Sequence, residues 1–489
     1  MVFSIIAILL FIYKYWLLHQ FTFHQIDSDQ TVMWYGLKEI SQGNFREPCF
    51  YGQSYNSMLE SILALPGYWI GFEPHHALPV TTMILSVIPF YCLGYVTFKK
   101  ISPLSGILVL CTAFIFRIEY DIISTLPRGF VTGLFVSIFI LPAILEASSI
   151  RIFIAGFFFV FSYTLNPNSI LFTIPLIFIL TMTSELNRRM IFYAFSGIFV
   201  GFILHLLIKN FYWIHPEYDL HSLQMNYEFS NIFKGIFSTD DLFHDVSPIF
   251  WNAHFLILPF FLISGIIFFI YKNKLAGMVC LLILALIIAS FGMDKTYDGS
   301  HSVFFSYTRM YLAIPLLFAL IFYFIPVRSI IFTIFFGFTA LTITSVKLLK
   351  REGLAKHLLD KPGMLPVIEY KRMKNDCINF KQLLDKYNVD IVLAKYHWMR
   401  DFYAYGCTVC IENFPTIIIP DYDRRVWLFK EVESTNYENI LIIDLNVDYS
   451  KKDSTIEKLH EMEGYYLIRN NNKNVFDLMT ALDIEYRKF

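Results

Sequence analysis

Long apolar runs recur from the N-terminus to about residue 348, separated by short polar segments. An apolar run of about 18 or more residues matches the bilayer thickness when it forms a helix. The pattern predicts eleven membrane-spanning helices, near residues 1–19, 76–98, 103–120, 123–145, 152–166, 168–184, 190–209, 250–271, 275–292, 306–326 and 329–348. The first run lacks the basic start and small-residue cleavage site of a signal peptide, so we expect it to stay in the protein.

The loops between these runs predict an orientation. Every second loop is basic and short, and the positive-inside rule places such loops in the cytoplasm. The N-terminus is then expected in the cytoplasm and the C-terminus outside. The basic residues are Lys99, Lys100, Arg151, Arg188, Arg189, Lys272, Lys274 and Arg328.

The apolar stretch from Ser57 to Phe72 is not counted as a span. It is short, and it contains Glu60 and a Pro66-Gly67 break. If it crossed the membrane, every later basic loop would face outside. We therefore expect a helix that lies on or dips into the outer interface.

Composition supports a membrane protein. Of the 489 residues, 56% are hydrophobic and only 16% are charged, an apolar content typical of polytopic membrane proteins. The formal net charge is −1, so no global positive field favours nucleic-acid binding. Membrane lipids, and no nucleic acid, are expected among the partners.

After residue 348 the chain becomes polar and changes its pattern. Strand-like runs begin at Asp390, Pro415 and Asn439, and helical stretches lie near 375–387 and 453–463. Alternating helices and strands predict a small α/β domain. The predicted fold is thus an α-helical polytopic membrane domain over 1–348, followed by an extracytoplasmic α/β domain over 349–489. Cys407 and Cys410 form a lone CxxC, for which two strand cysteines are favoured over a disulfide or redox role.

The first outer loop, residues 20–75, concentrates polar residues. Ser28 and Asp29 can cap a helix that starts at Gln30, and Gly43 can end it. Asp27 and Asp29 then sit at the acidic start of an interfacial helix. The alternative is that the two acids only cap the helix and interact with solvent.

The order of these features resembles the GT-C glycosyltransferases. Asp29 and Gly43 are fourteen residues apart, and Tyr51-Gly52-Gln53 precedes Leu59-Glu60. Within that superfamily the chain is similar to bacterial family-39-like proteins, relatives of the protein O-mannosyltransferases and of the lipid A aminoarabinose transferase. The predicted eleven-span layout with an external tail also matches. Gln30 departs from the pattern, because many relatives carry an acid there, and this leaves open which of the two aspartates is catalytic.

The resemblance implies a reaction and a location. A sugar on a polyprenyl phosphate would be transferred, with inversion, to the hydroxyl of a glycan, lipid or protein at the outer face of a bacterial cytoplasmic membrane. One carboxylate, Asp29 or else Asp27, would act as general base. Basic side chains at the outer ends of the predicted spans, Lys14, Arg128 and Arg309, would hold the leaving phosphate. The candidate substrate-binding residues are Lys14, Tyr51, Gln53, Tyr55, Arg128 and Arg309; for the three basic ones, anchoring or snorkelling at the interface is the alternative.

The sequence leaves open whether the protein binds a divalent metal ion. In the oligosaccharyltransferase relatives a second-loop acidic pair helps to bind a divalent ion, and here Glu119 and Asp121 could bind Mg²⁺ or Mn²⁺. The metal-free members are more similar in the first-loop motif, so no cofactor is certain. In the tail, Trp398, Tyr403 and Tyr405 could stack on sugar rings, with a core or interface position as the alternative, and Trp398 lies outside the residues described below. Asp421, Asp423, Arg424 and Arg425 are candidate acceptor contacts.

Two other functions compete with a transferase. A lipid-linked glycan flippase or transporter would place paired charges near the bilayer midplane. An O-antigen ligase or polymerase would place arginine and histidine in a long late loop. The early acidic loop favours the transferase.

Overall fold

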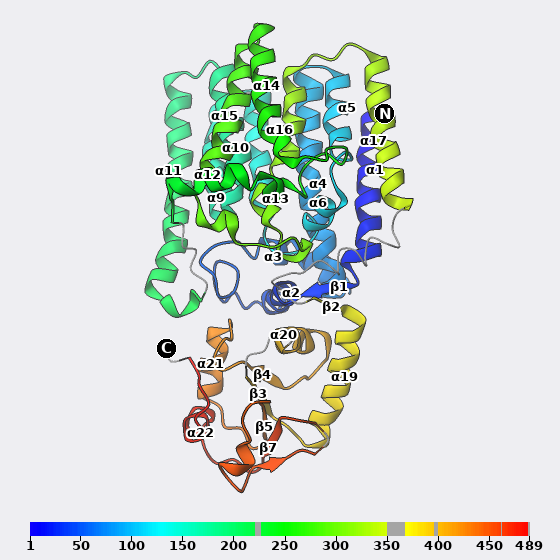
Figure 1. Cartoon of the computed structure of the whole chain (residues 1–489). Helices are drawn as coiled ribbons and strands as arrows, with labels where there is room; N and C mark the ends of the chain where they lie inside the picture. The colour runs from blue at the N-terminus through cyan, green and yellow to red at the C-terminus, as the bar shows by residue number, and fades with distance from the viewer. Residues whose placement is uncertain (221–225, 350–366, 396–399, 461, 488–489) are drawn as a thin grey trace.

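The computed structural model describes residues 1–220, 226–349, 367–395, 400–460 and 462–487. It is mostly helical, with a small sheet near the C-terminus. We call residues 1–349 the helical domain and residues 367–487 the tail domain. Figure 1 shows the tail domain at one end of the helical domain, with the segment after the first helix lying between them.

Five segments in the described part of the helical domain are long and apolar enough to cross a membrane. They are α1 (Val2–Leu17) with its π-helical extension to Thr22, α4 (Pro74–Lys100), α11 (Arg188–Ile214), the segment Tyr307–Phe324 that contains α16 (Ile314–Ile321), and α17 (Ile330–Leu349). These helices are compatible with an integral membrane protein.

Shorter apolar segments occupy the other predicted spans. They are α5 (Pro103–Thr112), Thr132–Leu145 with α7 (Thr132–Val136) and α8 (Leu141–Leu145), α9 (Ser149–Leu165), Pro167–Thr183 with α10 (Ile170–Thr183), His254–Ile270 with α14 (Ile257–Ile270), and α15 (Lys274–Ser290). Each is shorter than the usual length of a spanning helix. The count of eleven crossings therefore stays a prediction.

The predicted spans over 103–120 and 123–145 are interrupted where polar residues enter. Helix α5 ends at Thr112, and a separate short helix, α6 (Ile118–Ile123), carries Glu119 and Asp121. The next helix starts only at Thr132. Pro127 cannot donate a backbone hydrogen bond, and Gly129 has a φ of +75°, so the chain forms a loop here instead of a helix.

The first outer loop contains the expected helices. A strand, β1 (Gln25–Asp27), leads into α2 (Ser28–Ser41), and α3 (Leu59–Trp69) follows. Helix α2 begins two residues before the predicted start at Gln30. The predicted cap is wrong, because Asp27, and not Ser28 or Asp29, is the N-cap and accepts from the Gln30 N–H. Gly43, with a φ of +85°, follows the last turn as predicted. Helix α3 has 11 residues and is too short to be a spanning helix.

Short elements precede α14 and follow α15. In the described residues these are α12 (Phe229–Phe237) and α13 (Thr239–Phe243), with 3₁₀ turns at Pro216–Tyr218, Asp294–Tyr297, Val303–Phe305 and Tyr307–Tyr311.

The tail domain is an α/β fold, as predicted. Its sheet has the order β4 (Thr416–Ile418), β3 (Ile391–Ala394), β5 (Ile440–Ile443), β7 (Tyr465–Ile468) and β6 (Glu457–Lys458). Strand β3 is parallel to β4 and β5, and the other pairs are antiparallel. The helices are α19 (Tyr370–Lys386), α20 (Arg400–Cys410), α21 (Val426–Glu433) and α22 (Val475–Ala481). The predicted helix over 453–463 is wrong, because β6 lies there.

The first outer loop and the tail domain form one structural unit. Strand β1 pairs with β2 (Val367–Glu369), so that Asp27 lies opposite Val367. Trp34 and Leu37 of α2 belong to the same hydrophobic cluster as Ile391 of the sheet. The predicted boundary at residue 349 therefore does not separate two cores, and burial of apolar surface holds the tail domain against the loop.

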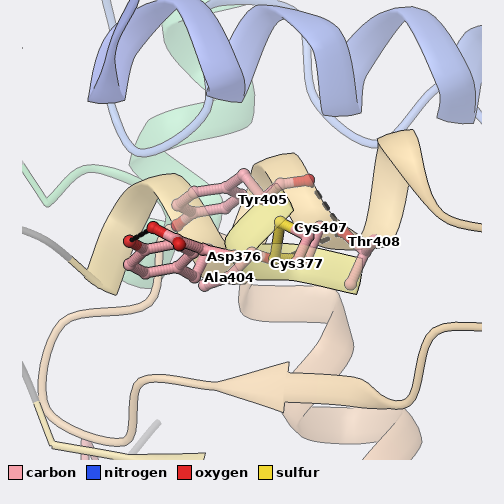
Figure 2. Close-up of a disulfide and its surroundings, with 7 residues drawn as sticks. Asp376, Cys377, Ala404, Tyr405, Cys407 and Thr408 are labelled. Atoms are coloured by element: carbon pink, nitrogen blue, oxygen red, sulfur yellow. Dashed lines mark hydrogen bonds between the residues drawn. A yellow bond between two sulfur atoms is a disulfide. The ribbon is translucent and has the colours of Figure 1, made fainter. Parts of the chain in front are cut away.

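A disulfide ties two tail helices together. Cys377 of α19 is bonded to Cys407 of α20, and both are buried (Figure 2). The interpretation of Cys407 and Cys410 as strand cysteines is wrong, because both lie in α20 and Cys407 bonds outside the CxxC. No spacing rule predicts this pair, because Cys377 lies 30 residues before Cys407 in the chain.

Candidate functional site

Asp27 is fully buried and has a structural position at the start of α2. Its Oδ1 accepts from the Gln30 N–H at 3.0 Å, and its Oδ2 accepts from Gln30 Nε2 at 3.1 Å. The Arg128 guanidinium forms an ion pair with Oδ2. Both carboxylate oxygens are therefore engaged. Gln30 thus donates to Asp27 from both its backbone and its side chain.

Asp29 is the more accessible acid of the pair. Its side chain is 16% exposed and lies between two guanidinium groups. Arg424 Nη1 is 3.1 Å from Oδ1, and Arg128 Nη2 is 3.8 Å from Oδ2. A carboxylate held between cations stays ionised, which is the state in which it can accept a proton.

Arg128 has donors to spare. Its side chain is nearly fully buried, and its Nε and Nη1 have no hydrogen-bond partner among the described residues. A buried N–H without a partner costs free energy, and a guanidinium has five such donors in a planar fork that matches phosphate. These two buried atoms therefore keep unused donor capacity among the described residues.

Glu60 holds the backbone beside Arg128. The Glu60 carboxyl is completely buried in α3, and its Oε2 accepts from the Gly129 N–H at 2.9 Å. A Cβ at Gly129 would lie 3.1 Å from the Ser57 carbonyl oxygen, so only glycine fits comfortably there. Burial raises the pKa of Glu60 to about 8, and this carboxyl is therefore largely protonated near neutral pH.

A cavity of about 310 Å³ opens near these groups. One wall is apolar, with Phe130, Leu171 and Leu286. The polar wall contains Tyr55, Asn56, Asn166, Asn168, Lys295 and Arg309. A mostly apolar cavity with a few convergent polar groups is typical of a ligand site.

Arg309 is a buried cation of this wall. Its Nη1 donates to the Ser306 carbonyl oxygen at 2.9 Å, and its Nη2 lies 3.4 Å from Asp298 Oδ2. Lys295 also pairs with Asp298, and its Nζ lies 5.6 Å from the Tyr55 ring centroid. One acid thus partly neutralises two cations, which leaves the cavity wall with excess positive charge.

Tyr55 links the cavity to Asp29. Burial raises the pKa of Tyr55 to about 12, the negative charge of Asp29 adds to this shift, and Arg309 and Arg424 oppose it. The phenol therefore stays protonated and can donate a hydrogen bond. These electrostatic contacts place Asp29, the two arginines and the cavity wall in one neighbourhood.

The turn Asn166-Pro167-Asn168 holds the cavity wall together. Asn166 Nδ2 donates to Asn56 Oδ1 at 2.8 Å and to the Gly129 carbonyl oxygen at 3.1 Å. Asn168 Nδ2 donates to the Arg309 carbonyl oxygen at 3.3 Å. The buried Asn168 Oδ1 has no hydrogen-bond partner in the described residues, so it can accept from a ligand.

The other residues of the predicted loop motif have different surroundings. Tyr51 is buried and packs edge-on against Trp427 of the tail domain, with ring centroids 4.6 Å apart, and it does not line the cavity. Gln53 has a buried Oε1 with no described partner. Glu47 stabilises the loop, because its Oε2 accepts a hydrogen bond from the Tyr212 hydroxyl at 3.0 Å.

Lys14 is not placed to bind the donor phosphate. It lies 2.7 Å from Asp121 Oδ1, and Lys347 lies 2.9 Å from Asp121 Oδ2. The Tyr13 hydroxyl also donates to Asp121. All of these side chains are buried. Lys14 is engaged in this buried cluster, and its phosphate contact stays a prediction that these contacts do not support.

The same contacts disagree with the predicted metal role of Asp121. Two ammonium groups and a phenol occupy the carboxylate oxygens that Mg²⁺ or Mn²⁺ would need. Glu119 lies on the same helix, α6. Among the described residues, no group of three His, Cys, Asp or Glu side chains could hold a metal ion. The residues present do not fit the metal site suggested by Glu119 and Asp121.

Sequence reasoning missed some residues of this site. Lys295 and Asp298 lie in a polar segment between α15 and the Tyr307–Phe324 helix. The argument that selected Arg128 and Arg309, a basic residue beside an apolar run on the predicted outer side, also applies to Lys295. The contact of Arg424 with Asp29 had no sequence signal, because 395 residues separate the two.

No model of a known protein family matches this chain, and no curated protein matches it at a significant level. The resemblance to GT-C glycosyltransferases therefore stays a hypothesis that rests on the loop motif and the layout of the helices.

Proposed function

We propose that this protein is a membrane glycosyltransferase that moves a sugar from a polyprenyl-phosphate donor to an acceptor hydroxyl, at the membrane face that carries the tail domain. The observation that carries the proposal is the position of Asp29, a partly exposed carboxylate flanked by Arg128 and Arg424 beside a cavity lined by Arg309. A base next to phosphate-binding cations is what the reaction requires.

Asp29 takes the role of general base. It removes the proton from the acceptor hydroxyl as the oxygen attacks the anomeric carbon of the sugar. The bond from that carbon to the phosphate oxygen breaks, and its electron pair leaves with the polyprenyl phosphate. Asp27 is less suited to this role, because it is completely buried and both of its oxygens have partners.

Arg128 and Arg309 take the role of phosphate ligands. The unpartnered Nε and Nη1 of Arg128 offer two donors, and Arg309 adds positive charge to the cavity wall. Cations held in a buried site stabilise a leaving phosphate without reorganising during the reaction. The apolar wall of the cavity suits the first units of the lipid tail.

The direction of the tail domain is also part of the proposal. The basic loops favour a cytoplasmic position for the opposite face. The Cys377–Cys407 disulfide adds independent support, because such bonds persist in oxidising compartments. Both point to an extracytoplasmic tail domain, and the family resemblance favours a bacterial cytoplasmic membrane.

The transporter alternative has less support. Its signature would be charged groups near the middle of spanning helices. The buried cluster of Asp121 with Lys14 and Lys347 comes nearest, and Lys347 lies in the last turn of α17. Their contacts with Asp121 account for them as a structural cluster.

The proposal is tested by comparing cells with and without the protein. Lipid, glycan and protein fractions are analysed by mass spectrometry for a product that carries one additional sugar. We expect one fraction to lose that modification when the gene is deleted and to regain it with the wild-type chain but not with Asp29→Asn. Identical fractions from all three strains would contradict a transferase.

A further inference from the structure

The tail domain contributes a cation to the acid site of the helical domain. Arg424 lies between β4 and α21, and its Nη1 is 3.1 Å from Asp29 Oδ1. The Arg424 side chain is 7% exposed. Charge-assisted hydrogen bonds of this kind are about twice as strong as neutral ones. The contact joins two segments that only the folded tail domain brings together (Figure 1).

Neighbouring contacts fix the segment that carries Arg424. The Arg424 N–H donates to the Tyr405 hydroxyl at 3.1 Å. Arg425 forms a fully buried ion pair with Asp423, at 2.6 Å, and Asp423 also accepts from the Ile419 N–H. Because these contacts fix the backbone on both sides of Arg424, its guanidinium is held in a defined position next to Asp29.

Gly52 leaves room for the stem of Arg424. A Cβ built at Gly52 would lie 3.1 Å from Arg424 Cγ and 3.2 Å from Arg424 Cβ. Gly52 also has a φ of +77°, which side-chain-bearing residues rarely adopt. The glycine of the Tyr51-Gly52-Gln53 motif thus lies where the tail-domain arginine crosses the loop.

We propose that Arg424 is a positioning residue for Asp29, so that the tail domain is part of the catalytic unit. Gly52 is the position at which the side chain of Arg424 crosses the first outer loop to reach Asp29. This inference rests on the proposed role of Asp29 as the base. Arg424 keeps the Asp29 carboxylate ionised and fixes its orientation. The charged and titratable groups around Asp29 are Asp27, Tyr55, Arg128, Arg309 and Arg424.

The first measurement is the pH dependence of transfer in Arg424→Ala and Arg424→Lys. Without a neighbouring cation a carboxylate is harder to ionise, so the acid limb of the kcat/KM profile should move to higher pH in Arg424→Ala. The value of kcat/KM at neutral pH should fall about ten- to a hundredfold, the worth of one charge-assisted hydrogen bond. Arg424→Lys should restore part of both effects.

A matched glycine pair separates this role from loop strain. Gly52→Ala should change the pH profile in the same direction as Arg424→Ala, because the new methyl group would lie too close to the Arg424 stem, which must then shift. Gly43→Ala is the control, since Gly43 has a similar φ of +85° but no atom within 4 Å of a built Cβ. Gly43→Ala should keep the wild-type pH profile. Equal profiles for Gly52→Ala and Gly43→Ala would overturn the role of Gly52.

A second readout does not depend on any activity. Thermal unfolding of the full chain in detergent is measured for Arg424→Ala, Asp29→Asn and the double variant. We expect the two single losses of Tm to be non-additive, as for residues in direct contact. Additive losses would overturn the contact itself. If instead Asp29→Asn abolishes transfer while Arg424→Ala keeps the wild-type pH profile, the proposed function stands and this inference fails.

Discussion

The guanidinium of Arg128 lies against the carboxylate of Asp27, and both side chains are almost completely buried. The two acids of the first loop therefore have different surroundings. Asp27 caps α2 and holds Arg128, whereas Asp29 is 16% exposed and interacts electrostatically with Tyr55 of the cavity wall. The same arginine thereby contacts both the helix cap and the proposed base, with donors left over for a phosphate.

The first prediction concerns the phosphate ligands. Arg309→Ala and Arg128→Lys should each weaken use of the donor, because a desolvated phosphate loses a charge-assisted hydrogen bond worth about 1.5–3 kcal/mol. Lysine at 128 keeps a positive charge beside Asp27 but loses the planar fork. Kinetics with varied donor concentration provide the measurement. Arg469→Ala, an exposed arginine paired with Glu457, is the control, and an unchanged donor KM and kcat in both site variants would remove them from the site.

The second prediction concerns Glu60 and pH. Burial raises the pKa of Glu60 from 4.5 to about 8, so the folded protein retains a proton that the unfolded chain has released. Its contribution to stability is therefore greatest at low pH and falls as pH rises through this range. Glu60→Gln should flatten the fall, and it keeps an oxygen for the Gly129 N–H. The difference in Tm between pH 5 and pH 8 measures this; equal differences in both proteins would contradict it.

The third prediction concerns the buried cluster around Asp121. Asp121→Asn leaves two buried lysines without their counterion and should lower the free energy of unfolding by about 3–5 kcal/mol. Lys347→Met should cost less, since Lys14 remains to pair with Asp121. Unfolding in detergent ranks the two variants. If Asp121 bound a metal instead, EDTA would lower the Tm of the wild type but not of Asp121→Asn.

The fourth prediction concerns the orientation of the tail domain. An impermeant thiol reagent should label Asn472→Cys in intact cells, because Asn472 is exposed in the tail domain. Lys100→Cys should be labelled only after the cells are opened, since its loop is predicted to be cytoplasmic. The reverse pattern would contradict the proposed orientation.

Much of the fold was predictable because it follows from local patterns. The apolar runs marked the helices, and the alternation after residue 390 marked β3, β4 and β5. The helix over 453–463 failed, because β6 is a short edge strand that forms only by pairing with β7. Lys14 was selected only from its position along the first apolar run, and the sequence could not show that Asp121 lies beside it.

The candidate site was predictable only in part, for a related reason. The loop motif selected Asp27, Asp29 and Tyr55, and the position of basic residues beside apolar runs selected Arg128 and Arg309. The structure brings these residues into one region. The partners that connect them come from elsewhere in the chain. Arg424 and Glu60 act through tertiary contacts with Asp29 and Gly129, and no spacing in the sequence encodes such contacts.

The most direct test of the account is sugar transfer by purified Asp29→Asn in detergent, from a defined polyprenyl-phosphate donor. Asparagine keeps the size of the side chain but cannot accept the proton. The variant should fold, retain donor binding and lose transfer by about a hundredfold or more, the usual contribution of a positioned base. Asp27→Asn should lose less transfer, although it leaves Arg128 without its buried partner. Wild-type transfer by the Asp27→Asn, Asp29→Asn double variant would contradict the catalytic role and leave the two acids as a helix cap.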